Sequence, residues 1–189
     1  DRIEAFGIET IGEALDRLSD AESIAIDMPI GFATAAEVGG RRCEKAARSM
    51  LGRGRTSSVF SSPCRAALET VDYPSASAAN RDSSPHRLGL SKQSHALFPK
   101  MRQIDDLMNS SLQDRVFEVH PEVSFTELAR LAGQTIVGNK KSAAGSSQRI
   151  RLLSDAGIPL TTALNQAKVL GAAADDIVDA AVAAWTARR

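Results

Sequence analysis

The stretch Ser23-Ile24-Ala25-Ile26-Asp27-Met28-Pro29-Ile30-Gly31 decides the fold that we predict for this chain. Its apolar run, residues 24–26, is short and continuous, and an acid, a proline and a glycine follow it closely. A short apolar run that ends in such residues is typical of a strand buried in a parallel sheet. The stretch therefore predicts a buried parallel strand with Asp27 at its carboxyl end.

A second strand is predicted at Arg115-Val116-Phe117-Glu118-Val119-His120-Pro121, which also ends in proline. Ser124 and Glu127 have the spacing of a capping box at the start of a helix. Strand, helices, strand, helices is an α/β order, and right-handed crossovers set the two strands parallel in one sheet. Residues 57–90 are rich in Ser, Pro and Ala and are predicted to be mostly loop, with one short helix. Apolar periodicity and helix signals predict helices at residues 9–18, 40–51, 63–69, 97–108, 124–131, 146–156, 161–170 and 175–188.

Length and composition predict one globular domain over residues 1–189. The chain has 189 residues, of which 43% are hydrophobic and 24% are charged, and these are ordinary globular values. Its formal net charge is zero, so any attraction to nucleic acid must be local. Cys43 and Cys64 have neither disulfide-framework nor zinc-site spacing. No apolar run reaches the length of a membrane span and no signal segment opens the chain, which predicts a cytoplasmic protein without a membrane partner.

Three groups of polar residues could carry chemistry. Asp27 either forms a turn before Pro29 or lies where ligands of open α/β sheets bind. Glu118 and His120 share one strand face, which is either an exposed edge or a site that converges on Asp27. The last group opens the final predicted helix: Asp175, Asp176 and Asp179. These acids either favour the helix dipole, or Asp176 and Asp179 share a face that binds a divalent cation.

Basic residues are concentrated between positions 41 and 55, and further lysines follow at Lys92, Lys100, Lys140 and Lys141. They either form a solvated helix face or neutralise phosphates beside the acidic site. With His120, the predicted substrate contacts are Arg41, Arg42, Arg53, Arg55 and Lys100. If they bind phosphates, the affinity for nucleic acid should fall steeply with salt.

Several motifs together resemble an uncharacterised prokaryotic family, the domain of unknown function 429, which is described as a predicted nuclease of the RNase H fold. The matching stretches are IAIDMPIG (24–31), RRCEKAARSMLGRGRTSSVF (41–60), SKQ (91–93), PK (99–100), VFEVHPEVSF (116–125) and DDIVDAAVAA (175–184). The resemblance implies an RNase H-like mixed sheet flanked by helices. It also implies a nuclease site that binds Mg²⁺ or Mn²⁺ through Asp27, Asp176 and Asp179. Glu118 and Glu122 match family positions whose role is unassigned, and we take Glu118 as a further catalytic candidate.

One departure from that family concerns the start of the chain. Relatives begin with a Gly-Val-Asp-Gly strand that opens an antiparallel hairpin, whereas residues 1–8 here match only its tail. The resemblance therefore predicts an N-terminally incomplete domain that lacks the first metal ligand. We expect the missing hairpin to expose an apolar strand edge, so that the chain self-associates and does not cleave nucleic acid alone.

The leading functional hypothesis is a metal-dependent phosphodiesterase that acts on nucleic acid, because clustered carboxylates can hold the ions that activate water. The carboxylates of Asp27, Asp179 and at least one of Asp176 or Glu118 should then face one cleft. The second hypothesis is a non-catalytic RNase H-like domain that binds nucleic acid or a protein. A third is a small-molecule phosphotransferase or nucleotide binder, against which the absence of a glycine-rich phosphate loop counts.

Overall fold

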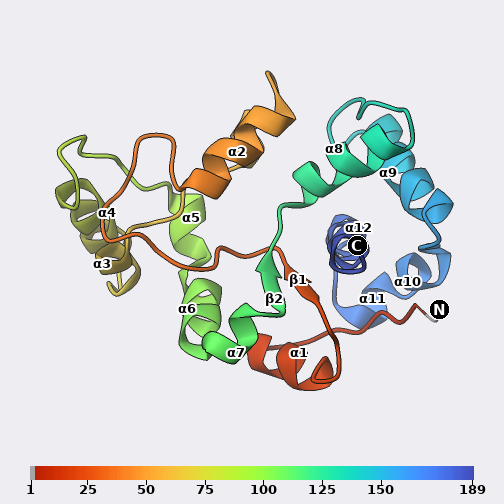
Figure 1. Ribbon diagram of the computed structural model, residues 1–189, viewed down its shortest axis with the longest axis horizontal. Coiled ribbons are helices and arrows are strands. Elements are labelled where there is room, and N and C mark those ends of the chain that lie inside the picture. Colours follow the sequence, from red (N-terminus) through yellow and green to blue (C-terminus); the bar gives the residue numbers. More distant parts are fainter. Residues whose placement is uncertain (1–2) are drawn as a thin grey trace. The chain divides into compact units, whose positions relative to one another are not determined.

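The computed structural model describes residues 3–189 and divides the chain into two compact units. The first unit combines the residues up to Asp27 with Gln113–Arg189, and the second is Met28–Leu112. Where the sequence predicts one domain, the residues between the two strands form an inserted unit with a core of its own. The elements are coloured along the chain in Figure 1. Residues 1 and 2 of the predicted hairpin tail lie outside the described residues, and residues 3–8 form no helix or strand.

The predicted α/β order and the parallel pairing of the two strands are confirmed. Strands β1 (Ile24–Ile26) and β2 (Val116–Glu118) pair in parallel, with Ile24 opposite Val116 and Ile26 opposite Glu118. Val116 is buried, whereas the neighbouring Phe117 is 47% exposed, because successive side chains of a strand point to opposite faces. Glu118 therefore lies on the same face as the buried Val116.

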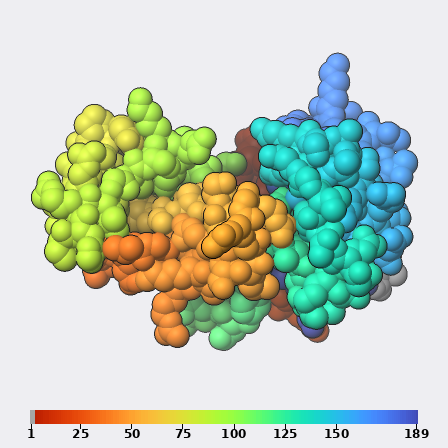
Figure 2. All heavy atoms as spheres, turned by 90° about the horizontal axis from the view of Figure 1, so that it is seen from above, coloured from red at the N-terminus to blue at the C-terminus, as the bar shows by residue number. Residues whose placement is uncertain are grey.

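Helices form the rest of the first unit. Helix α12, which is blue in Figure 1, runs beside β1. Helices α8 and α9 pack together, and their atoms are adjacent on the surface of this unit in Figure 2. The helices are α1 (Ile11–Arg17), α8 (Pro121–Leu131), α9 (Ala143–Asp155), α10 (Thr161–Asn165), α11 (Ala167–Leu170) and α12 (Ala174–Ala187). The core of this unit includes Phe125, Leu128, Leu152, Leu153, Val182 and Trp185.

The predicted capping box at Ser124 is wrong. Helix α8 already begins at Pro121, which is favoured in the first turn because its missing N–H would have no helical partner there. Ser124 consequently lies inside the helix and is buried. Its hydroxyl accepts a 2.8 Å hydrogen bond from Thr186 of α12, so it joins two helices instead of starting one.

The second unit consists of helices around a small apolar core. This core includes Phe32, Leu68, Ala76, Leu90, Phe98 and Met101. The helices within Met28–Leu112 are α2 (Arg42–Leu51), α3 (Arg65–Leu68), α4 (Tyr73–Asp82), α5 (Lys92–Ala96) and α6 (Phe98–Leu107), with a 3-10 turn at Thr56–Ser58. A short helix α7 (Ser110–Gln113) precedes β2.

Helix α4 was predicted as loop, and the prediction is wrong for a physical reason. The helix buries Ala76, Ser77 and Asn80, which are small or polar residues, so no large apolar residues mark its inner face. Its start is nevertheless well defined, because the Asp72 side chain accepts a 2.9 Å hydrogen bond from the backbone N–H of Ser75.

A buried carboxylate organises the start of α2. Glu44 is only 4% exposed and accepts hydrogen bonds from Arg41 Nε at 2.7 Å and from the Ser62 hydroxyl at 2.6 Å. Gly40 has a φ of +75° next to this carboxylate, and a Cβ there would collide with Glu44 Oε2. Burial alone would raise the pKa of Glu44, but the hydrogen bonds from Ser62 and Arg41 outweigh it and lower the pKa.

We predict that Glu44→Gln destabilises the second unit and flattens its acid unfolding. Removing charged hydrogen bonds from a buried site costs about 1.5–3 kcal/mol each. Because the folded pKa lies below the ordinary value of 4.5, this stability is present above that value and is lost as pH falls through the folded pKa. Urea unfolding from pH 2 to 7 measures both effects. Glu37→Gln is the matched control, because Glu37 is an exposed carboxylate that pairs with Lys45. It should change the free energy of unfolding and its pH dependence little.

Candidate functional site

The carboxyl ends of both strands bring polar residues together within the first unit. Asp27 follows the last residue of β1, and the backbone N–H of Val119 donates to the carbonyl of Ile26 at 2.9 Å. The residues just after β1 therefore lie beside those just after β2. In this way the sheet brings Asp27 near Glu118 and His120, as the strand ends predicted.

Asp27 has the most perturbed carboxyl of this group. Burial among protein atoms raises the pKa of Asp27 to about 6, the charge of His120 opposes the rise, and the charges of Asp179 and Glu118 add to it. The residue nevertheless remains exposed to solvent. Asp27 is therefore a candidate for a functional site, because solvent still reaches its carboxyl and because neighbouring charged side chains shift its pKa.

Asp179 reaches this group from the second turn of α12. Its carboxylate accepts a 2.7 Å hydrogen bond from Lys140 Nζ, which also lies 4.0 Å from Asp175 Oδ2. Burial raises the pKa of Asp179, and Lys140 only partly opposes that rise. Burial alone would lower the pKa of Lys140, but the hydrogen bond and charge of Asp179 outweigh it and raise the pKa.

Asp176 does not join these side chains. Its exposed carboxylate accepts a 3.2 Å hydrogen bond from the backbone N–H of Ala173 and so caps the start of α12. On a helix, residues three apart and residues four apart both share a face. The sequence predicted that the i,i+3 pair Asp176 and Asp179 binds a cation. In the structure it is the i,i+4 pair Asp175 and Asp179 that lies beside the ammonium of Lys140. The helix-dipole interpretation therefore describes Asp176, and of the three predicted metal ligands Asp27 and Asp179 remain.

The polar residues that follow β2 differ in their roles. Glu118 and His120 are half-buried, and their charges influence the pKa of Asp27. Glu122, in the first turn of α8, instead pairs with the buried Arg149, whose Nη2 lies 2.8 Å from both carboxylate oxygens. Arg149 also stacks on Phe125, with 5.5 Å between its guanidinium carbon and the ring centroid.

We tested whether a metal ion fits these side chains. Within residues 3–189, no three His, Cys, Asp or Glu side chains gather closely enough to hold a metal ion. Mg²⁺ often takes only one or two protein carboxylates and completes its shell with waters and substrate phosphates. Asp27 and Asp179 are close enough for their charges to interact, which makes them the candidate pair of carboxylates. Lys140 is the residue that competes for Asp179.

The predicted basic contacts all belong to the second unit. Arg42, Arg53 and Lys100 are exposed, and Arg55 is half-buried. Arg41 is bound internally, because its guanidinium donates to Glu44 and to the carbonyls of Ile30 and Gly31. These residues belong to another unit than Asp27, so a basic rim beside the carboxylates stays a prediction.

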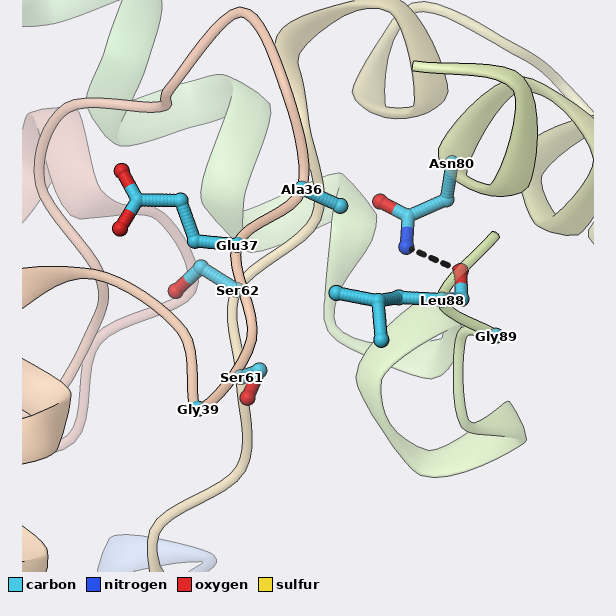
Figure 3. Close-up of a pocket in the computed structure, with 8 residues that line it drawn as sticks. All are labelled: Ala36, Glu37, Gly39, Ser61, Ser62, Asn80, Leu88 and Gly89. Atoms are coloured by element: carbon cyan, nitrogen blue, oxygen red, sulfur yellow. Dashed lines mark hydrogen bonds between the residues drawn. The ribbon is translucent and has the colours of Figure 1, made fainter. Parts of the chain in front are cut away.

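The second unit also holds a small cavity of about 150 Å³. Figure 3 shows the Asn80 amide donating to the carbonyl of Leu88 at one side of it. None of the predicted site residues is among those that line it, which are Ala36, Glu37, Gly39, Ser61, Ser62, Asn80, Leu88 and Gly89.

Sequence reasoning missed the role of Lys140. It lies 39 residues before Asp179, so no local spacing connects the two. The stretch Gly138-Asn139-Lys140-Lys141-Ser142, with turn residues around a pair of lysines, was the available signal. Such a signal predicts a loop but not the carboxylate that the loop faces.

Comparison with known proteins gives the family. No helix among residues 3–189 is long and apolar enough to cross a membrane. No curated protein and no solved structure shows significant similarity to the chain. A family described as "Protein of unknown function (DUF429)" matches residues 1–189, the whole length of the sequence. The chain therefore belongs to this family, as its motifs had indicated.

Proposed function

We propose that this protein is a metal-dependent phosphodiesterase that acts on nucleic acid, with Asp27 and Asp179 as the carboxylates that bind Mg²⁺ or Mn²⁺. The observation that carries the proposal is that α12 lies against β1 and places Asp179 close enough to Asp27 for the two charges to interact. Two carboxylates that repel each other in a crowded setting gain stability when a divalent cation lies between them.

The chemistry divides between the ion and the side chains. A bound divalent cation activates water and offsets charge on the leaving oxygen. Asp27 and Asp179 hold it, and Glu118 adds negative charge near Asp27. In this proposal His120 contacts the substrate beside Asp27, and the exposed Arg42, Arg53 and Lys100 bind phosphates.

We also propose that the fold is an RNase H-like variant. The parallel pairing of β1 and β2, the carboxylate after β1 and the second carboxylate on the last helix support this assignment. A solved structure of the protein, compared with RNase H-like folds, tests the assignment directly.

The decisive experiment is a cleavage assay on labelled single-stranded and double-stranded DNA and RNA. With the Gly-Val-Asp-Gly hairpin of the relatives added before residue 1, we expect cleavage with Mn²⁺ or Mg²⁺ and none with a chelator, whereas residues 1–189 alone should not cleave. The competing function is a non-catalytic domain that binds nucleic acid or a protein. The Lys140–Asp179 pair favours that alternative, because Lys140 already neutralises one of the two carboxylates. Binding of nucleic acid without cleavage at any metal concentration would decide for it.

Mn²⁺ affinity should rise with pH through about 6. A carboxyl binds the ion only when it is ionised, and the pKa of Asp27 is raised to about 6. Affinity should therefore increase from pH 5 to 7 and level off above it. Titration calorimetry at several pH values measures this, and Asp27→Asn should remove most of the dependence. A flat profile for the unaltered protein would contradict the assignment of Asp27.

A further inference from the structure

The ammonium of Lys140 occupies one of the positions at which a cation could contact the Asp179 carboxylate. Its Nζ is 2.7 Å from Asp179 Oδ2 and 4.0 Å from Asp175 Oδ2. The Lys140 side chain is 35% exposed and that of Asp179 only 15%. The pair is therefore partly screened from water, so that its charges interact more strongly than those of an exposed pair.

The loop that carries Lys140 is fixed to α9 on both sides of this lysine. Before it, the buried Gln148 donates to the carbonyl of Thr135 and accepts from the backbone N–H of Val137, both at 2.8 Å. After it, the Ser142 side chain caps α9 by accepting from the N–H of Gly145 at 3.1 Å. These bonds hold the backbone of the loop in a defined position.

The turn next to Lys140 is also packed closely against the start of α9. The Ser142 hydroxyl donates to the carbonyl of Asn139 at 2.8 Å, and the Asn139 side chain accepts from the N–H of Lys141 at 2.9 Å. A Cβ at position 145 would collide with the carbonyl of Asn139, so only glycine allows this approach. Lys140 therefore reaches Asp179 from a fixed base, unlike a mobile surface lysine.

We propose that Lys140 is a built-in substitute for the divalent cation: its ammonium occupies Asp179 until the metal ion displaces it. This inference rests on the proposed function. Two cations at one carboxylate repel each other, so a metal ion that binds Asp179 must move the ammonium away. The lysine stem can do this without moving the loop, because it has four rotatable carbons and a third of its surface is exposed.

The test is direct Mn²⁺ binding by the full chain, measured by titration calorimetry. Lys140→Met should bind Mn²⁺ about tenfold more tightly, because the competing ammonium is gone. Lys140→Arg keeps the charge and should bind no more tightly than the unaltered protein. Lys141→Met removes the neighbouring exposed charge and is the matched control, with an expected change below about twofold.

A second measurement covers folding of the variants. Without metal, Lys140→Met should unfold at a lower temperature, and added Mn²⁺ should raise its unfolding temperature more than that of the unaltered protein. Lys140→Gln, which still donates a hydrogen bond, should also bind more tightly and serves if methionine prevents folding. Equal or weaker Mn²⁺ binding by the neutral variants would overturn the inference and leave the proposed function standing. Absence of Mn²⁺ binding in every form, the unaltered protein included, would overturn both.

Discussion

Asp27→Asn and Asp179→Asn are each expected to reduce Mn²⁺-dependent cleavage by roughly a thousandfold. A catalytic metal contributes several kcal/mol of transition-state stabilisation, and each 1.36 kcal/mol changes the rate about tenfold. An amide in place of either carboxylate removes a charged ligand but keeps the size of the side chain. Initial cleavage rates at several Mn²⁺ concentrations measure the loss, and calorimetry should show weaker Mn²⁺ binding in parallel.

Asp176→Asn is the control for these variants. It lies on the same helix and three residues before Asp179, but its carboxylate only caps the helix end. Its cleavage rate should stay within about threefold, with a stability loss of up to about 1 kcal/mol from the weaker helix-end charge. If Asp176→Asn lost about a thousandfold in cleavage rate while Asp179→Asn stayed active, Asp176 would be the metal ligand in place of Asp179.

Arg149→Met is expected to destabilise the first unit by about 3–5 kcal/mol, because it leaves the Glu122 carboxylate in the protein interior without its cation. Arg149 is 1% exposed, and its guanidinium donates to both oxygens of Glu122 and to the carbonyl of Gly145. The guanidinium also lies over the ring of Phe125. Methionine fills a similar volume, so the loss of stability comes from the missing charge and hydrogen bonds more than from a cavity. Urea unfolding followed by circular dichroism measures it.

The double variant Glu122→Gln/Arg149→Met separates the two causes of that loss. Removing both charges should recover part of the stability, because no uncompensated charge then remains inside. Arg151→Met, an exposed residue on the same helix, should change the free energy of unfolding by less than about 0.5 kcal/mol. A double variant less stable than Arg149→Met would show that Glu122 has another role.

The sequence predicted those features that depend on local pattern. The run Ile24–Ile26 and the proline after His120 defined both strands, and their parallel pairing followed from the helices between them. Asp27 was found because an acid that directly follows a buried strand lies at the edge of the sheet. Helix α4 was missed because its buried face carries Ala76, Ser77 and Asn80, which large-apolar periodicity cannot detect.

The part of the site that depends on tertiary packing could not be predicted. Asp175, Asp176 and Asp179 all have helical spacing, and only the position of α12 against the Lys140 loop selects Asp175 and Asp179. Likewise, the sequence assigned no role to Glu122, and only the structure shows that it pairs with the buried Arg149. The division into two units also escaped prediction, because no change in composition marks Met28 or Leu112.

The interruption of the first unit by Met28–Leu112 has a consequence for how the protein folds. Pairing Ile24 with Val116 closes a chain loop of about 90 residues, and the entropy of closing such a flexible loop costs roughly 4 kcal/mol. Early folding of the insertion would shorten the flexible part of that loop and lower this cost. The parallel pair can form once β2 has been synthesised, whereas the meeting of Asp27 and Asp179 also requires α12. A nascent chain would thus acquire the candidate carboxylate pair later than the sheet that carries Asp27.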